Sequence, residues 1–350
     1  MGTDQDILGM LELMLRPGFC VKNNRIEQLN TAAQILPLQL GMDVRELLAT
    51  GRQEYAAFDG GCLYLSLHLP PRDLGASVTR LDGWDIFVLD DQDSDSALQA
   101  LSLAARTLRG AMSTTMLAAS QLLNDAPQDS QQAALLNQGM YQLLRILSNM
   151  SDAGRYVSTS QQELLDIGSL FCEILEKAQT LLGATGIQLH YQPLAETVVT
   201  LADREQLERA LLNLLSNAIK FSSGSAPITV SLTRRGQMLY LHIQNSGQMA
   251  QSILSNAFTR YLRQAGLEES QQGLGLGLVL VRAAAVNHGG TVLIDQPDKN
   301  NVRITMTLAI RRSSGNALRS PILRPDYAAD RDHALVELSD CLNPSAYRQD

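Results

Sequence analysis

The chain has 350 residues, a length that suggests two or three domains. Its 36 acidic and 28 basic side chains give a formal net charge of −8, which argues against general electrostatic binding to nucleic acid. Hydrophobic residues make up 45 %, which excludes a largely disordered chain, and 4 scattered cysteines argue against a zinc site or a disulfide framework.

Two features bear on the cellular compartment. The most apolar stretches are shorter than the roughly 20 residues that a membrane-spanning helix needs. The N-terminus contains Asp4 and Asp6 and lacks the basic-then-apolar order of a signal peptide. We therefore expect a soluble, cytoplasmic protein without a membrane segment.

Residues 1–92 are predicted to form a small domain of strands and one helical stretch. The strongest strand candidates are Cys62–Leu69 and Trp84–Leu89, each bounded by Gly or Asp. The acidic run 90–96 then indicates a hinge and a helix start, because Asp and Ser are good N-cap residues.

Residues 93–157 are predicted to form a two-helix antiparallel hairpin, because two apolar seams with steps of three and four flank a polar break around Pro127. Two copies of such a hairpin would close their apolar surfaces as a four-helix bundle. The alternative is a single hairpin that packs on its neighbouring domains. The seams are Leu98, Leu101, Ala105, Leu108, Met112, Thr115, Ala119 and Leu122, then Ala133, Leu136, Met140, Leu143, Leu147 and Met150.

Residues 158–312 alternate helices and strands, and two of the strands, near 228–233 and 238–244, are joined by a tight turn. Such strands must be antiparallel, which favours an α/β sandwich over a doubly wound parallel sheet. Residues 313–350 are predicted to be a C-terminal tail with one short amphipathic piece. The other expected strands lie near 187–192, 291–294 and 302–309.

The first chemical motif lies in a predicted helix. Asn213 and Asn217 are four residues apart and Lys220 follows three residues later, so the three side chains share one helix face. Amide oxygens suit a hard cation such as Mg²⁺, and an ammonium group suits phosphate. The pattern indicates a magnesium–triphosphate site, or alternatively a solvated face with chance polar residues.

A glycine run strengthens the first interpretation. Gly273, Gly275 and Gly277 precede a strongly apolar helical stretch about 50 residues further on. Glycines let backbone N–H groups approach phosphate, and the N-terminus of a helix favours anions. A glycine run alone could be a flexible loop, whereas the two motifs together favour a nucleotide site.

These motifs resemble the ATP-binding domain of sensor histidine kinases, which gyrase and the Hsp90 chaperone share. The resemblance covers residues 158–312 and includes an adenine loop at 245–249, a phenylalanine segment at 257–261 and the sequence 287–290, Asn-His-Gly-Gly. It implies ATP and Mg²⁺ as cofactors. It also implies Asn217 as the magnesium ligand with Asn213 beside it, Lys220 at the phosphates, Asn245 and Gly247 at the adenine, and Gly273, Gly275 and Gly277 as lid hinge and phosphate cradle.

The resemblance extends upstream. A helical hairpin before this domain is where the family dimerises and carries its phosphoacceptor histidine. Residues 1–92 are similar to a PAS-type sensor domain, whose opening strand–turn–strand and helix start correspond to residues 18–33. The fold implied is an α+β multidomain chain: a PAS-like α/β domain, a hairpin that forms a four-helix bundle as a dimer, and a histidine-kinase-type ATPase α/β sandwich.

The phosphoacceptor is the main departure from the family pattern. The Leu108-Arg109 pair aligns Arg106 with the histidine and Thr107 with its acidic neighbour, and no histidine lies in the hairpin. Arginine stays protonated and offers no lone pair for attack on phosphate. Gly110 stands where the family's phosphatase activity needs Thr or Asn. We therefore assign no catalytic residue.

The adenine loop also departs from the family. Asn245 replaces the aspartate that accepts the adenine amino group, which would weaken binding by about 1–2 kcal/mol. Met249 replaces a glycine that permits tight turning, and the lid at 264–272 is short.

The resemblance thus implies a cytosolic sensor-histidine-kinase homologue in two-component-type signalling, a pseudokinase that binds ATP weakly or not at all. It would act by dimerising, as a homodimer or as a heterodimer with an active histidine kinase, and would meet a response regulator but no nucleic acid. The alternatives are an active kinase that phosphorylates a partner protein and an interaction scaffold that binds no nucleotide.

Overall fold

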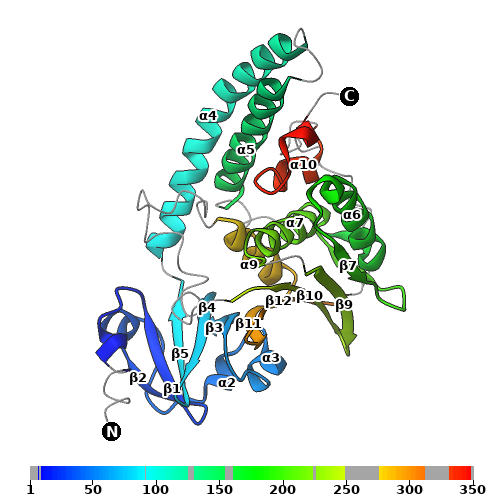
Figure 1. The fold of residues 1–350 in the computed structure, drawn as a ribbon. Coiled ribbons are helices and arrows are strands. Elements are labelled where there is room, and N and C mark those ends of the chain that lie inside the picture. Colours follow the sequence, from blue (N-terminus) through cyan, green and yellow to red (C-terminus); the bar gives the residue numbers. More distant parts are fainter. Residues whose placement is uncertain are drawn as a thin grey trace.

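The computed structural model describes residues 7, 9–90, 92–124, 130–153, 161–223, 226–248, 276–311 and 331–347. An N-terminal sheet, a long helical hairpin and a helix-covered second sheet follow one another along the chain (Figure 1). No helix in these described ranges is long and apolar enough to cross a membrane.

The N-terminal sheet is antiparallel with strand order β2-β1-β5-β4-β3. The two strands predicted for this region are confirmed as β3 and β5, whereas β4 was not predicted. The predicted opening is also confirmed in its local structure, since Asn30 caps the helix after β2 by accepting from the Ala33 N–H. The elements are β1 (Gly18–Lys22), β2 (Arg25–Leu29), η1 (Thr31–Ile35), α2 (Val44–Leu47), α3 (Arg52–Ala56), β3 (Cys62–Leu69), β4 (Arg72–Leu81) and β5 (Trp84–Leu89).

The hairpin consists of α4 (Gln92–Asn124) and α5 (Gln131–Ala153), so the predicted break is confirmed. One side of the hairpin packs inward. At one end, Leu98 and Ala153 contact the first turns of helix α9 (Leu276–Asn287). The seams are only partly as predicted, because Thr115 is exposed and its neighbour Met116 is buried.

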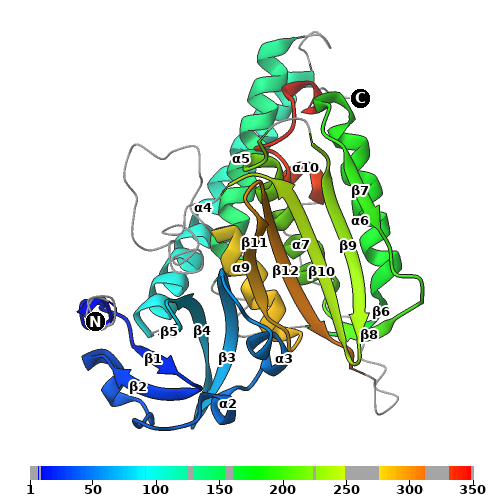
Figure 2. The same ribbon diagram turned by 60° about the horizontal axis from the view of Figure 1, so that its bottom comes forward.

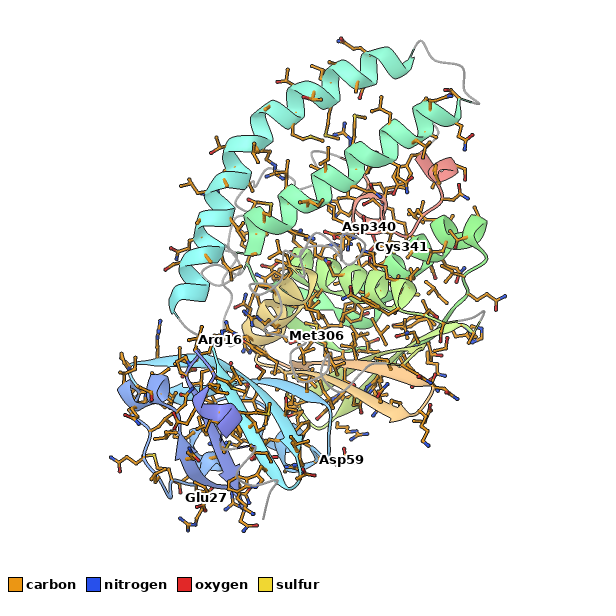
Figure 3. All side chains as sticks on the ribbon, turned by 60° about the vertical axis from the view of Figure 1, so that its left-hand side comes forward. Arg16, Glu27, Asp59, Met306, Asp340 and Cys341 are labelled. Carbon is orange, nitrogen blue, oxygen red and sulfur yellow. The ribbon has the colours of Figure 1, made fainter. Side chains whose placement is uncertain are left out.

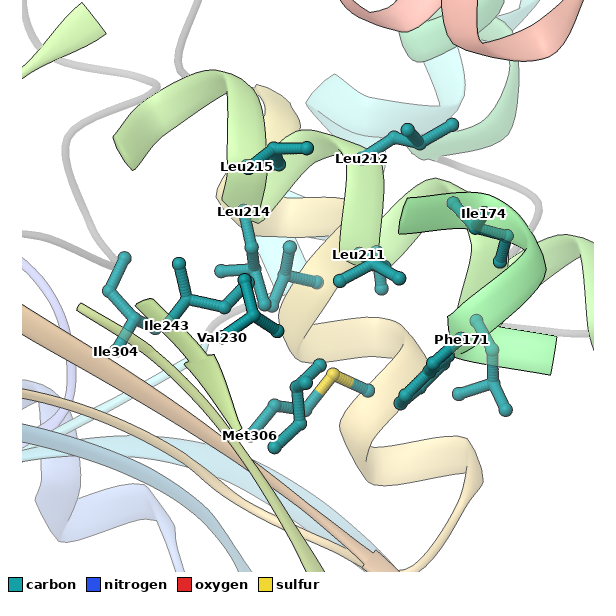
Figure 4. Close-up of a cluster of buried hydrophobic side chains, with 14 of the residues drawn as sticks. Phe171, Ile174, Leu211, Leu212, Leu214, Leu215, Val230, Ile243, Ile304 and Met306 are labelled. Carbon is teal, nitrogen blue, oxygen red and sulfur yellow. The ribbon is translucent and has the colours of Figure 1, made fainter. Parts of the chain in front are cut away.

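The second sheet has strand order β7-β9-β10-β12-β11, with β7 parallel to β9 and the other pairs antiparallel. This confirms the predicted sandwich. Figure 4 shows strand side chains such as Val230 and Met306 meeting Leu211 and Leu214 of α7 in the core. The elements are β6 (Glu163–Asp166), α6 (Ile167–Leu182), β7 (Leu189–Gln192), β8 (Val199–Ala202), α7 (Arg204–Lys220), β9 (Ile228–Arg235), β10 (Met238–Ser246), α9, β11 (Val292–Asp298) and β12 (Asn301–Ala309).

The two sheets are joined edge to edge, although the sequence predicts separate domains. Strand β3 pairs antiparallel with β11, which places Cys62 opposite Ile294, and the result is one ten-stranded sheet (Figure 2). Gly61 makes the close approach possible: its φ is +87°, and a Cβ there would lie 2.2 Å from the Ile294 carbonyl oxygen. Across the join, the Tyr240 hydroxyl donates to Glu54 at 2.8 Å.

The predicted tail folds back onto the molecule. Its amphipathic piece contains α10 (His333–Glu337), followed by η4 (Pro344–Tyr347). Figure 1 shows this segment beside α5, α6 and α7. We call residues 331–347 the C-terminal segment. Its apolar side chains, among them Val336 and Leu338, are buried against α5 and against the core of the second sheet.

Candidate functional site

Helix α7 carries the predicted asparagines. Asp203 caps its start by accepting from the Gln206 N–H, and its leucines are buried on the sheet side. On the other side lies a row of four polar side chains at helical spacing, which we call the polar row of α7: Arg209, Asn213, Ser216 and Lys220. Asn217 lies at the edge of this row and is partly buried.

The structure brings parts of three predicted motifs together around α7. A Cβ at Gly277 would lie 2.6 Å from the Asn213 Oδ1, so the start of α9 closely approaches that asparagine. At the other end of α7, a Cβ at Gly247 would lie 2.7 Å from the Phe221 carbonyl oxygen. Asn245, just before this glycine on β10, is buried and donates to the Ser246 carbonyl. The two glycines can accept this crowding because they have no side chain.

Several predicted residues cannot be placed. Gly273, Gly275 and Met249 lie outside the described residues, as do the phenylalanine segment 257–261 and the lid 264–272. The structure therefore gives the positions of Asn213, Asn217, Lys220, Asn245, Gly247 and Gly277.

His288 ties α9 to the start of α7. Its Nε2 accepts from the Asp203 N–H at 2.9 Å, and its Nδ1 donates to the Ala284 carbonyl at 2.6 Å. These two bonds require the neutral ring with the proton on Nδ1. Burial lowers the pKa of His288 from its ordinary value, against the opposing effects of the Ala284 carbonyl and the Asp203 carboxylate.

Stability is expected to fall as the pH is lowered below about 6.5, because the unfolded chain then binds a proton that folded His288 resists. Above that pH the contribution is fully present. Below about pH 6.5, His288 lowers the free energy of unfolding by at most about 1.4 kcal/mol per pH unit. Urea unfolding of the wild type and His288→Gln at pH 7.5 and 5.5 measures it, since the other histidines are common to both proteins. Equal losses on acidification in the two proteins would contradict the prediction.

The polar row of α7 is part of a buried ion network. Arg209 is fully buried, pairs with Asp152, donates to the Asn149 carbonyl oxygen Oδ1 at 2.6 Å and donates to Glu337 at 2.9 Å. Arg145 of α5 donates to Glu337 at 3.4 Å. A buried guanidinium needs such partners, because an unpaired charge in the interior is strongly unfavourable.

The C-terminal segment supplies two carboxylates to this row. The Asn213 Nδ2 donates to Glu337 at 3.1 Å, and the Lys220 Nζ lies 2.5 Å from Asp340. Arg145 also pairs with Asp340, at 2.6 Å. Figure 3 shows Asp340 where the segment passes between the hairpin and the second sheet's helices. Two of the three motif side chains on α7 are therefore already bonded to the chain's own carboxylates.

Sequence reasoning missed this arrangement. The only local signal is that the amphipathic piece carries Glu337 and Asp340 three residues apart, so that both carboxylates fall on one side of a short helical turn. Nothing in that pattern says which basic surface the turn meets.

Comparison with known proteins identifies the type of domain that contains the second sheet. Residues 202–312 match the family model described as histidine kinase-, DNA gyrase B-, and HSP90-like ATPase. Residues 202–312 thus form a histidine-kinase-type ATPase domain, and the chain is similar to sensor histidine kinases.

Two relatives cover a larger part of this histidine kinase homologue. The chain is 27 % identical to the adaptive-response sensory kinase SasA of Synechocystis over 61 % of its own length and 59 % of that protein's. It is 26 % identical to SasA of Prochlorococcus marinus over 67 % of each chain. This chain thus spans about three fifths of the length of the Synechocystis protein. The crystal structure of full-length ShkA in complex with AMPPNP has a TM-score of 0.50, 18 % identity, and coverage of 62 % of this chain and 47 % of its own, which shows similarity of fold.

The hairpin of this histidine kinase homologue carries Arg106 on an exposed face of α4. Its neighbour Ala105 is buried, so Arg106 faces away from the core of the hairpin. Gly110, one turn later, is also exposed and has no atoms near its Cβ position. The positions expected for phosphoacceptor chemistry are thus accessible but hold no group that can attack phosphate.

The residues fit a magnesium nucleotide only in part. Asn217 has no hydrogen-bond partner for its side-chain amide among the described residues, which leaves its oxygen available to a hard cation. Asn213 and Lys220, by contrast, are satisfied by Glu337 and Asp340. A triphosphate could bind Asn213 and Lys220 only if it displaced those two carboxylates.

Proposed function

We propose that this chain is a cytoplasmic sensor-histidine-kinase homologue of two-component-type signalling that does not phosphorylate itself and regulates partners through dimerisation of its hairpin. The observation that carries the proposal is Arg106, which stands exposed on α4 at the position aligned with the phosphoacceptor. Replacing a nucleophilic imidazole with a permanently charged guanidinium removes the first chemical step.

The proposed nucleotide is ATP with Mg²⁺, bound weakly. Asn217 would hold the metal, Lys220 would meet the phosphates, and Asn245 would accept from the adenine. When bound, magnesium would neutralise charge on the phosphates. The residues of this chain would orient the nucleotide, with Asn213 beside the metal ligand and Gly277 giving the phosphates access to the backbone of α9.

The test is incubation of the purified chain with magnesium and ATP labelled on the terminal phosphate. We expect no acid-labile phosphate on the protein, and its appearance would overturn the proposal. Transfer of label to a co-purified response regulator would instead favour an active kinase that acts on a partner. A scaffold without nucleotide is the second candidate, because Asn213 and Lys220 already hold carboxylates. Absence of ATP binding at millimolar concentration would favour that scaffold.

Dimerisation is supported by the face of the hairpin that does not pack inward. Leu136 and Leu143 are one heptad apart on α5 and are 50 % and 51 % exposed, and Leu108 on α4 is 52 % exposed. The same exposed class includes Leu103, Leu117, Leu135 and Ile146. Leucines at heptad spacing fit a second helical hairpin, and a second copy of this chain supplies one.

Leu143→Lys is expected to weaken self-association on the order of 100-fold, since a charge replaces an apolar group at the proposed interface. Sedimentation over a range of concentrations measures the effect. Leu164→Lys is the matched control, because Leu164 is 56 % exposed but lies on β6, away from the hairpin. Equal association of both variants would contradict the proposed interface.

A further inference from the structure

The polar row of α7 is covered by the chain's own C-terminal segment. We propose that this segment is a tethered competitor of the nucleotide, whose carboxylates hold side chains that the phosphates would otherwise engage. The proposal rests on the nucleotide site proposed above and adds a reversible block to it. The segment and the nucleotide are then alternative occupants of one basic surface.

Charge complementarity carries the first part of the argument. Asp340 meets both Lys220 at 2.5 Å and Arg145 at 2.6 Å, and Glu337 meets Arg209 and Asn213. Carboxylate oxygens and phosphate oxygens accept hydrogen bonds from the same N–H donors at similar distances. The segment therefore satisfies the surface with the same chemistry that a polyphosphate would use.

The C-terminal segment binds a specific position on α5. Three amide side chains of α5 donate to backbone carbonyls of the segment: Asn137 to Tyr347 at 2.8 Å, Gln138 to Ser339 and Leu342 at 3.0 Å, and Gln142 to Ser339 at 3.3 Å. Ser339 and Leu342 follow the end of α10, and Tyr347 is the last residue of η4, so the amides of α5 hold the segment at both ends. These hydrogen bonds to α5 fix the register in which Asp340 meets Lys220.

Apolar burial holds the segment in this register. Val336 packs with Met116 and Met140 of the hairpin, while Leu338 and Tyr347 join the core of the second sheet. The segment thus bridges the hairpin and α7. Because the segment binds α5, a shift of the hairpin against α7 would move the segment with it, separating Asp340 from Lys220 and Glu337 from Asn213. Dimerisation and access to the nucleotide site would then be coupled.

The first experiment weakens the block without removing the segment. Asp340 is about one-third exposed, and buried Arg145 keeps its pair with Glu337 when Asp340→Asn removes one charge. Calorimetric binding of Mg-ATP to the full chain is expected to become about three- to tenfold tighter, because docking of the segment lowers the apparent affinity. Glu196→Gln is the control, since Glu196 forms an exposed pair with Arg234 elsewhere and should leave the affinity unchanged.

The second experiment locks the block in place. The Cys341 Sγ lies 3.4 Å from the Ser216 Oγ, so Ser216→Cys in a Cys172→Ser background offers a disulfide between the segment and α7. Oxidation is expected to lower the apparent affinity for Mg-ATP about tenfold or more, and reduction of the same sample should restore it. The reduced protein is the reference for the oxidised one.

The outcomes separate the two proposals. Loss of binding on oxidation, together with tighter binding by Asp340→Asn, supports the competition. If the oxidised and reduced forms bind Mg-ATP equally, the competition is overturned and the nucleotide site stands. If no form binds Mg-ATP at millimolar concentration, including reduced protein with Asp340→Asn, the nucleotide site fails and the competition fails with it.

Discussion

Arg209→Met is expected to lower the free energy of unfolding by about 3–5 kcal/mol. The side chain is fully buried and pairs with Asp152 and Glu337, which are themselves 4 % and 0 % exposed. Methionine fills a similar volume but leaves both carboxylates short of their main positive partner in the interior. The cost is therefore that of uncompensated buried charge and not of a lost surface bond. Denaturant unfolding measures it.

Arg204→Met on the same helix is the matched control. Arg204 pairs with Glu173 at 2.8 Å, but the two side chains are 46 % and 67 % exposed. Water already solvates this pair, so its removal should cost less than about 1 kcal/mol. Similar losses in the two variants would show that Arg209 is not held by the network described above. A selective loss in Arg209→Met should also increase proteolysis of the C-terminal segment, because Glu337 belongs to it.

Gly61→Ala is expected to cost about 3 kcal/mol or more and to open the join between the two sheets. Two effects add. A positive φ costs an alanine about 1–2 kcal/mol, and the new methyl group would meet the Ile294 carbonyl oxygen 2.2 Å away. That oxygen belongs to β11, so the backbone of the join must shift. Hydrogen exchange of the amides in β3 and β11, together with denaturant unfolding, measures the effect.

Gly83→Ala separates the two contributions. Gly83 has φ +79°, close to that of Gly61, but nothing lies within 4 Å of its Cβ position. The control should therefore show the positive-φ strain alone, with slow exchange preserved in β11. If Gly61→Ala behaves like Gly83→Ala, then the close approach to Ile294 has no energetic role and the join tolerates a side chain.

Local patterns predicted the elements well. The predicted strand at 62–69 agrees with β3, and the predicted polar break falls between α4 and α5. The reason is that side-chain periodicity reports which residues face a core, whatever that core is. Strand β4 was missed because Gly75 and charged residues interrupt its apolar run. Gly75 is needed there, since a Cβ would collide with the Tyr64 hydroxyl.

Two of the sequence motifs lie close together in the structure. Asn213 and Gly277 are far apart in the sequence, yet they meet as the resemblance to histidine kinases implied. That Asn213, Asn217 and Lys220 form a magnesium–triphosphate site stays a prediction. Asn217 remains without a side-chain partner among the described residues, but the other two hold carboxylates of the C-terminal segment. Helical spacing gives the direction of a side chain and not the identity of what covers it.

The sequence by itself determined most of the helices and strands and the type of the ATPase domain, because periodicity and motif spacing are local properties. Only the tertiary structure decided that β3 pairs with β11 and that Glu337 and Asp340 cover the polar row of α7. Edge pairing uses backbone groups that every residue carries. Ion pairs between residues more than 100 positions apart likewise produce no periodic pattern in the sequence. The sequence around a carboxylate in the C-terminal segment does not indicate whether that carboxylate is solvated or pairs with a buried arginine.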